Sequence, residues 1–433
     1  MGCLANSTGG NESARHKTDG PLQCHRAGCR VTGVITSTKG MPPMPHKILP
    51  WLAMASAMSA FTLQAQPMTD SELLLGSYTQ GKSEGMYRFG FDSKTGMIDT
   101  TPRQVIKTEN PSWLTVSKDQ RYLYVVNENG PGQRDTVGKV SSFSIDPKTF
   151  NITPINQVET KGEEPTHSSL SKDGRYLFVA NYAVNPDPGG ALTVMPVGKD
   201  GRLGESVQVL PLGPGSKVNP ERQMSSHVHL AVPTPDDKYV VSADLGADKL
   251  FVYRYDADQS KPLQPAKVPF VQLPAGSGPR HVQFSRDGKH AWLVLEMSAQ
   301  VVTFDYLDGG FKQTQVVDMK NKGVDQKNGG GALHTSPDGR FLYVTNRGEA
   351  NQVVVFRIDP ATGTLEEIQR RTVEGNEPRE FSFDPSGKFM LFANQKSNQI
   401  VTVRRDPQTG LIGETVQKFD VDAPSYLHFL GNK

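Results

Sequence analysis

Cysteine is almost missing from this 433-residue chain, because its three cysteines, Cys3, Cys24 and Cys29, all fall within the first thirty residues. The rest of the chain has no thiol that could form a disulfide, ligate a metal or act as a nucleophile. We therefore expect the folded body to use neither disulfide nor thiolate chemistry.

An excess of one charge is missing as well. The 47 lysines and arginines nearly balance the 45 aspartates and glutamates, which leaves a formal net charge of +2. A protein that binds nucleic acid needs a basic surface to hold the phosphates. The composition therefore argues against a nucleic-acid partner.

Several common catalytic motifs are also missing from the sequence. It contains no Gly-x-Ser-x-Gly elbow, no His-Glu-x-x-His helix, no Walker loop and no dinucleotide-binding glycine pattern. Each of these motifs places a nucleophile, a zinc ion or a phosphate in a defined backbone setting. Their absence argues against the enzyme classes that depend on them.

The apolar segment Ile48–Leu63 is shorter than the ~20 residues that a membrane-spanning helix needs. His46 and Lys47 precede it and the small Ala65 follows it, a pattern typical of a secretory signal. A buried or membrane-anchoring helix is the alternative, but no stop-transfer cluster of charges follows. We predict a disordered or upstream extension over 1–43, a signal segment over 44–65 and a folded domain over 66–433. The mature protein would then be exported, to the periplasm, with no membrane span.

Turn-forming residues are abundant, with 42 glycines and 31 prolines. The segment Gly278–Glu296 has apolar residues on both sides of Asp287-Gly288, which predicts two antiparallel strands joined by a tight turn. Similar turns have their second residue at positions 119, 173, 236, 287, 338 and 386, spaced by 54, 63, 51, 51 and 48 residues. A period near fifty, with two further strands in each unit, is typical of a β-propeller blade.

Six full units run from Pro111 to about Ala423, and residues 73–109 supply three more strands. The innermost strand that this seventh unit lacks is present at the other end of the chain, in Pro424–Leu430. We therefore predict an all-β, seven-bladed β-propeller with four antiparallel strands per blade. The C-terminal strand would join the N-terminal blade and leave no open edge.

Alignment of the units identifies two groups of residues that differ from blade to blade. The first group begins the innermost strands: Ser112, Thr166, His229, Arg280, Gly331, Arg379 and Ser425. The second group follows the neighbouring strands: Glu128, Tyr182, Leu245, Glu296, Arg347 and Gln395. Because these strands are antiparallel, both groups should meet at the face opposite the Asp-Gly turns. Variation at one face of a repeat protein is typical of a binding surface.

The sequence resembles the seven-bladed propeller lactonase family, which includes propeller-type 6-phosphogluconolactonase and fungal 3-carboxy-cis,cis-muconate cyclase. The resemblance extends over residues 71 to 430 and depends on five segments: Gly278–His281, Leu295-Glu296, Leu333–Arg340, Thr345–Arg347 and Glu377–Arg379. The unit that contains the turn at 338 departs from the family pattern, because it begins with Gly329-Gly330-Gly331 in place of a proline.

The resemblance implies a catalytic set of His229, Arg280, Glu296 and Arg347, with His227 a competitor for the histidine role. Glu296 or His229 could activate water, and the two arginines could stabilise the oxyanion of a lactone or bind a phosphate or carboxylate. A structural ion pair between Arg280 and Glu296 is the alternative.

Four further residues are candidate substrate-binding residues: His227, His334, Arg379 and Glu128. The alternative for His334 is a structural hydrogen bond. For Arg379 it is a solvated charge, and for Glu128 it is a plain loop position. His281 and His167 alternate to the other side of their strands, so we expect them to pack between blades. Arginines stand where a metal-dependent propeller lactonase would need ligands, so we expect no metal and no cofactor.

We expect a monomer that hydrolyses a sugar-derived or anionic lactone. The alternatives are a cycloisomerase of carboxy-muconate type, and a non-enzymatic propeller that binds a ligand or a protein at the same face. The family members known for sugar-phosphate chemistry look cytoplasmic, whereas a signal segment precedes this domain. A phosphorylated lactone is also not an obvious periplasmic substrate.

Overall fold

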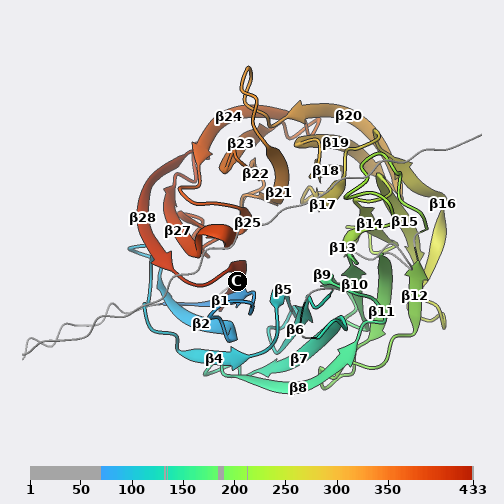
Figure 1. Cartoon of the computed structure of the whole chain (residues 1–433), viewed down its shortest axis with the longest axis horizontal. Coiled ribbons are helices and arrows are strands. Elements are labelled where there is room, and N and C mark those ends of the chain that lie inside the picture. The colour runs from blue at the N-terminus through green and yellow to red at the C-terminus, as the bar shows by residue number, and fades with distance from the viewer. Residues whose placement is uncertain (1–69, 131–132, 134, 184–189, 212, 432–433) are drawn as a thin grey trace, which may run out of the picture. The chain divides into compact units, whose positions relative to one another are not determined.

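Seven β-sheets surround a central axis, as Figure 1 shows. The computed structural model describes residues 70–130, 133, 135–183, 190–211 and 213–431. The predicted extension over 1–43 and the predicted signal segment over 44–65 lie outside the described residues. Within the described residues, no helix has the length and apolar character needed to cross a bilayer.

Six of the sheets have four antiparallel strands that follow one another along the chain. Their bounds are β5 (Pro111–Val116), β6 (Tyr122–Asn127), β7 (Lys139–Ile145), β8 (Ile152–Glu159); β9 (Pro165–Leu170), β10 (Tyr176–Asn181), β11 (Ala191–Pro196), β12 (Gln208–Pro211); β13 (Val228–Pro233), β14 (Tyr239–Asp244), β15 (Lys249–Tyr255), β16 (Leu263–Gln272); β17 (Pro279–Phe284), β18 (His290–Leu295), β19 (Gln300–Leu307), β20 (Gly310–Asp318); β21 (Asn328–Thr335), β22 (Phe341–Gly348), β23 (Gln352–Ile358), β24 (Leu365–Thr372); β25 (Pro378–Phe383), β26 (Phe389–Asn394), β27 (Gln399–Arg405) and β28 (Ile412–Asp420). A short 3-10 helix, η1 (Gln395–Ser397), follows β26.

The seventh sheet joins the two ends of the propeller. It contains β1 (Ser71–Ser77), β2 (Gly85–Asp92), the short β3 (Met97–Ile98), β4 (Gln104–Lys107) and the C-terminal β29 (Pro424–Leu430). Strand β29 pairs antiparallel with β1 along the register Glu72↔Leu430 to Ser77↔Pro424. This pairing confirms the predicted seven blades and their closure by the C-terminal strand.

Each hairpin between the two innermost strands is fixed by the side chain of its own turn. In the β17–β18 hairpin, Asp287 accepts hydrogen bonds from the Ser285 hydroxyl at 2.7 Å and from the Lys289 amide at 3.1 Å. Gly288 supplies a φ of +71° that most other residues adopt only with strain. The recurring turn sequence therefore encodes the recurring hairpin.

The hydrophobic core lies between consecutive blades. Leu230 and Val252 of one blade pack with Leu293 and Phe304 of the next, and all four side chains are buried. Burial of each such side chain stabilises the fold by about 1.5–3 kcal/mol. Similar clusters join the other blades, so every sheet depends on its neighbours.

A β-bulge at the start of the innermost strand is the feature that positions the site. On β17 the register passes from Pro279↔Leu295 to His281↔Val294, so Arg280 is an extra residue. The same irregularity recurs in all seven sheets, and the extra residues include each member of the first varying group: Ser112, Thr166, His229, Arg280, Gly331, Arg379 and Ser425.

The bulge corrects the expectation for His281 and His167, because an extra residue interrupts the alternation of side chains. His281 does not pack between blades. Its ring lies 5.5 Å from that of Trp113, 5.8 Å from that of His167 and 5.1 Å from that of His229, all on innermost strands of other blades. Both histidines therefore line the central axis.

Candidate functional site

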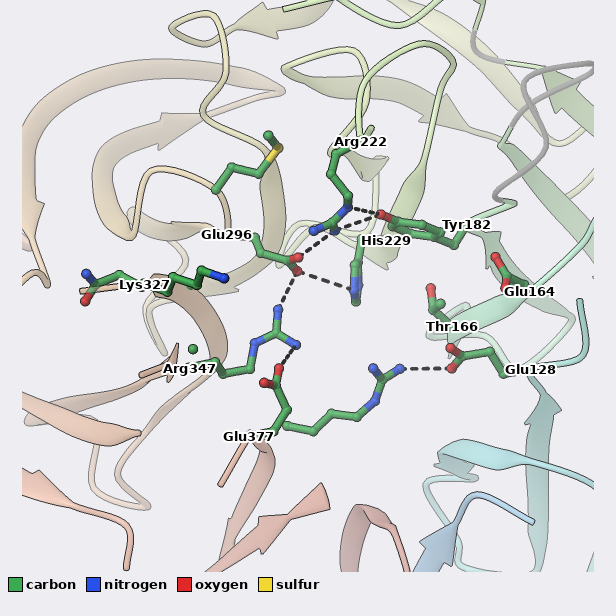
Figure 2. Close-up of a pocket in the computed structure, with 15 residues that line it drawn as sticks. Glu128, Glu164, Thr166, Tyr182, Arg222, His229, Glu296, Lys327, Arg347 and Glu377 are labelled. Atoms are coloured by element: carbon green, nitrogen blue, oxygen red, sulfur yellow. Dashed lines mark hydrogen bonds and ion pairs between the residues drawn. The ribbon is translucent and has the colours of Figure 1, made fainter. Parts of the chain in front are cut away.

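A pocket of about 580 Å³ opens at the end of the axis where the innermost strands begin. Figure 2 shows its residues, which come from strands of four blades and from loops that follow or precede strands of six. Its lining comprises Glu128, Glu164, Thr166, Tyr182, Arg222, His229, Glu296, Met297, Lys327, Asn328, Gly329, Arg347, Gly348, Glu377 and Arg379.

Glu296, just after β18, is the hub of this pocket, and its side chain is only 9 % exposed. One carboxylate oxygen, Oε1, lies 2.7 Å from a terminal nitrogen of Arg222. The other, Oε2, lies 2.7 Å from Arg347 Nη2 and 3.2 Å from Arg280 Nε. Three guanidinium groups, from β17, from β22 and from the loop before β13, therefore share one carboxylate.

The charges around Glu296 decide its ionisation. Burial by itself would raise the pKa of its carboxyl group, but the positive charges of Arg347, Arg222 and Arg280 outweigh burial and hold the pKa well below its usual range. Glu296 is therefore a stable anion and a weak proton acceptor.

Arg280 lies beneath the pocket floor with only 2 % of its side chain exposed. Its Nη1 donates a hydrogen bond of 2.9 Å to the carbonyl of Gly331. Burial, together with the charge of Arg347, lowers the pKa of Arg280 to about 9. A side chain on Gly331 would collide with Thr345 and press on Arg347, so the absence of a side chain there makes room for Arg347.

His229, the extra residue of β13, stands beside Glu296 on the pocket floor. Its Nε2 is 4.0 Å from Glu296 Oε2, and Figure 2 shows the two side chains facing each other. Burial and the charge of Arg280 lower the pKa of His229 well below its usual value, although Glu296 opposes the shift. The imidazole is therefore neutral at physiological pH.

Arg379 and Glu128 form a second ion pair across the pocket, with Arg379 Nη2 2.9 Å from Glu128 Oε2. The Tyr78 hydroxyl donates to the same oxygen at 2.8 Å, and the Arg379 guanidinium lies over the Tyr78 ring. Both predicted residues therefore line the pocket, where each is held by the other.

Two predicted substrate-binding residues do not line this pocket. The His227 ring is stacked on Tyr182 with centroids 4.6 Å apart, and its Nδ1 is 3.0 Å from the Tyr182 carbonyl oxygen. His334 forms a 2.6 Å contact with Glu380 on the neighbouring innermost strand. His334 lies beyond the bulge of β21, where the strand is regular, so it does not occupy the extra position from which some of the pocket residues come.

The lining residues that were not among the predicted site residues include Arg222, Tyr182 and Glu377. Arg222 donates 2.8 Å and 3.2 Å hydrogen bonds to the Tyr182 hydroxyl, and Glu377 lies 3.1 Å from Arg347 Nη1. Burial raises the pKa of Tyr182 to about 12. The 63-residue spacing between the turns at 173 and 236 was a signal for Arg222, because the extra residues form its loop.

No group of three or more histidine, cysteine, aspartate or glutamate side chains in the described part of the chain is arranged to hold a metal ion. The pocket carboxylates of Glu128, Glu296 and Glu377 are instead engaged by guanidinium groups. Three of the four carboxylates that line this pocket are therefore already paired with arginines.

Comparison with known proteins gives three kinds of match. Residues 72–429 match the family described as "Lactonase, 7-bladed beta-propeller". The chain is 33 % identical over 327 residues to the 6-phosphogluconolactonase of Bacillus subtilis (strain 168), a match that covers 75 % of this chain and 88 % of the relative. It is 32 % identical over 357 residues to the 6-phosphogluconolactonase of Formosa agariphila, a match that covers 82 % of this chain and 98 % of the relative.

Among solved structures, the periplasmic gluconolactonase of Pseudomonas aeruginosa, PpgL, aligns with a TM-score of 0.81 and 50 % sequence identity. The alignment covers 83 % of this chain and 99 % of that protein. Its sequence is thus more similar to this chain than the sequences of the two 6-phosphogluconolactonases are.

Proposed function

The chain belongs to the family of seven-bladed β-propeller lactonases, and we propose that it hydrolyses a sugar-derived lactone in the pocket around Glu296. The observation that carries this proposal is one buried carboxylate that holds three guanidinium groups beside a neutral imidazole. Lactone hydrolysis needs a proton acceptor for water and a positive field for the developing oxyanion. This arrangement supplies both.

The geometry favours His229 over Glu296 as the base. Three arginines stabilise the Glu296 anion and make it a poor proton acceptor. Burial also lowers the pKa of His229, but its neutral imidazole keeps a free lone pair, and the imidazolium that it forms on accepting a proton would face Glu296 at 4.0 Å. We assign Glu296 the role of facing His229 and holding the arginines. We assign Arg347, which lines the pocket, the role of stabilising the oxyanion, while Arg280 beneath the floor adds positive potential.

The experiment is an assay of acid release from a panel of sugar, phosphosugar and carboxylated lactones. We expect turnover of a sugar lactone, no loss of rate with EDTA, and a fall of about 100-fold or more in kcat for His229→Gln. Absence of turnover with every lactone of the panel would overturn the proposal. Product analysis on a carboxylated muconate separates hydrolysis from cycloisomerisation.

The charge balance of the pocket favours an unphosphorylated substrate. The lining residues include four cations, Arg222, Lys327, Arg347 and Arg379, and four carboxylates, Glu128, Glu164, Glu296 and Glu377. Each of the three arginines already has a carboxylate partner. Among the described residues, Lys327 is the lining cation with no ion pair, and Figure 2 shows it extending toward the middle of the pocket. A phosphate dianion would have to compete with the glutamates.

We therefore expect kcat/KM for gluconolactone to exceed that for its 6-phosphate by about tenfold or more. Glu128→Gln should narrow the difference, because it frees Arg379 to bind the phosphate. Glu366→Gln, which removes an exposed carboxylate paired with Arg357 on an outer strand, is the matched control. A wild-type preference for the phosphorylated lactone would contradict this substrate assignment but not lactone hydrolysis.

We also propose that the protein is exported to the periplasm. The signal-like segment over residues 44–65 supports this, as does the printed description of the Pseudomonas aeruginosa relative as periplasmic. N-terminal sequencing of protein from a periplasmic fraction should find a start near Gln66, whereas an uncleaved N-terminus in the cytoplasmic fraction would overturn the assignment.

A further inference from the structure

A second cavity, much smaller than the pocket, lies on the axis directly beside it. Its volume is about 10 Å³, on the order of what one water molecule needs. Thr166, His229 and Arg379 line both cavities, so these side chains form the partition between them. Because these side chains also line the pocket, a water bound to them where the two cavities meet can contact a substrate in the pocket.

Two buried polar atoms on this partition have no hydrogen-bond partner among the described residues: Thr166 Oγ1 and His229 Nδ1. Both residues are 5 % exposed and both are the extra residues of their bulges, on the adjacent strands β9 and β13. A buried polar atom without a partner costs about 1–3 kcal/mol. Native proteins keep such atoms mainly where water or a ligand satisfies them.

Ser425 shows what the same position looks like when its hydroxyl has only a structural role. It lines the small cavity and is the extra residue of β29. Its Oγ is hydrogen-bonded to the carbonyl oxygens of Gly76 at 2.9 Å and Pro111 at 3.2 Å. Thr166 occupies the equivalent place in its blade without such a carbonyl partner.

We propose that Thr166 Oγ1 and His229 Nδ1 together hold the water molecule that attacks the lactone carbonyl. This inference rests on the proposed function and adds Thr166 as a residue that contacts the reacting water. A proton on His229 Nε2 faces Glu296, which leaves the Nδ1 lone pair to accept a hydrogen bond from the water.

The step balances with water as the only co-reactant. The water oxygen forms a bond to the carbonyl carbon while His229 Nδ1 takes one of its protons and the carbonyl electron pair moves onto the oxygen. When the carbonyl re-forms, the bond from the carbon to the ring oxygen breaks, and the ring oxygen takes the proton back from Nδ1. The product is an open-chain hydroxy acid. Thr166 contributes a hydrogen bond and exchanges no proton.

Crystallography of the mature, unliganded protein tests the site without using activity. We expect an ordered water within hydrogen-bond distance of Thr166 Oγ1 and His229 Nδ1, and its loss in Thr166→Val. In the same variant kcat should fall about tenfold with KM within about twofold, since one hydrogen bond to the water is lost. Thr166→Ser, which keeps the hydroxyl, should restore most of kcat.

The matched control is Thr115→Val, which removes a hydroxyl bonded to the Ser168 carbonyl at 2.8 Å on the opposite half of the axis. It should lower thermal stability without changing kcat. A wild-type crystal with no water between the two atoms overturns the inference, as does an unchanged kcat in a folded Thr166→Val protein. If no lactone is hydrolysed, the proposed function fails, while the crystallographic result still decides the site.

Discussion

At the scale of single residues, the charge of Glu296 is what allows three guanidinium groups to lie close together. Arg280 and Arg347 are buried, so neither charge can be screened by solvent once the carboxylate is removed. The same carboxylate faces His229, with Oε2 4.0 Å from Nε2. Stability and the proposed catalysis therefore depend on one side chain.

Glu296→Gln should lower the free energy of unfolding by about 3–5 kcal/mol, because it leaves buried positive charges without compensation. It should also lower kcat by more than the fall in stability accounts for, since His229 loses the carboxylate that faces it. Urea denaturation and steady-state kinetics below the unfolding transition measure the two effects. Full activity in this variant would exclude a role for Glu296 in the reaction.

Three histidines around the axis make stability depend on pH. Burial, followed by the charge of Arg280, lowers the pKa of His167 to about 3 and lowers the pKa of His229 and His281 well below 6.5. The unfolded chain therefore binds more protons than the folded chain between their folded pKa values and about 6.5. Their contribution is complete above that pH and is lost as the pH falls.

We expect the free energy of unfolding to decrease from pH 7 to pH 5, with a slope that approaches about 4 kcal/mol per pH unit if all three groups contribute. Most carboxyl groups titrate below this interval, so histidines dominate the slope. His167→Gln should reduce the slope by the contribution of one proton, about 1.4 kcal/mol per pH unit. Chemical denaturation at several pH values tests this, and a flat profile would contradict it.

At the scale of elements, the loop between β12 and β13 brings Arg222 to the pocket from outside the repeat. The Gln223 side chain anchors it with hydrogen bonds to the Leu245 carbonyl at 2.9 Å and to Asp248 at 2.8 Å. Ser226 adds a 2.6 Å bond to Asp244. Arg222 is therefore held firmly although its side chain remains 41 % exposed.

Arg222→Met should lower kcat/KM by about 10- to 100-fold, because Glu296 Oε1 and the Tyr182 hydroxyl both lose their guanidinium partner. The change in stability should stay below about 1 kcal/mol, since a half-exposed ion pair contributes little. Lys217→Met, in the exposed part of the same loop, is the control and should leave both quantities unchanged. A large loss of stability with unchanged kinetics would assign Arg222 a structural role instead.

At the scale of the whole propeller, stability depends on closure of the ring. Strand β29 forms the inner edge of the seventh sheet, and Leu427 and Leu430 pack into two different inter-blade clusters. Without this strand, β1 would expose an unpaired edge and the bulged Ser425 position would be lost from the axis.

Deletion of residues 424–433 should therefore abolish cooperative unfolding near the wild-type melting temperature and promote aggregation. A chain that ends at Gly431 is the control and should melt like the wild type. Differential scanning calorimetry distinguishes the two. Retained cooperative unfolding in the longer deletion would mean that six blades suffice for the ring.

The sequence alone determined the seven-bladed architecture and its closure, because blade period and turn chemistry are local properties that repeat along the chain. It also brought Arg280, Glu296 and Arg347 to one face, since antiparallel pairing places the start of one strand beside the end of the next. Tertiary structure alone decided the side of the strand from which His281 and His167 project, because a bulge changes the direction of a side chain without changing the pattern of apolar residues. It also decided the partners of Arg222 and Arg379, which come from segments distant in the chain, and distances between blades are not encoded in any local motif.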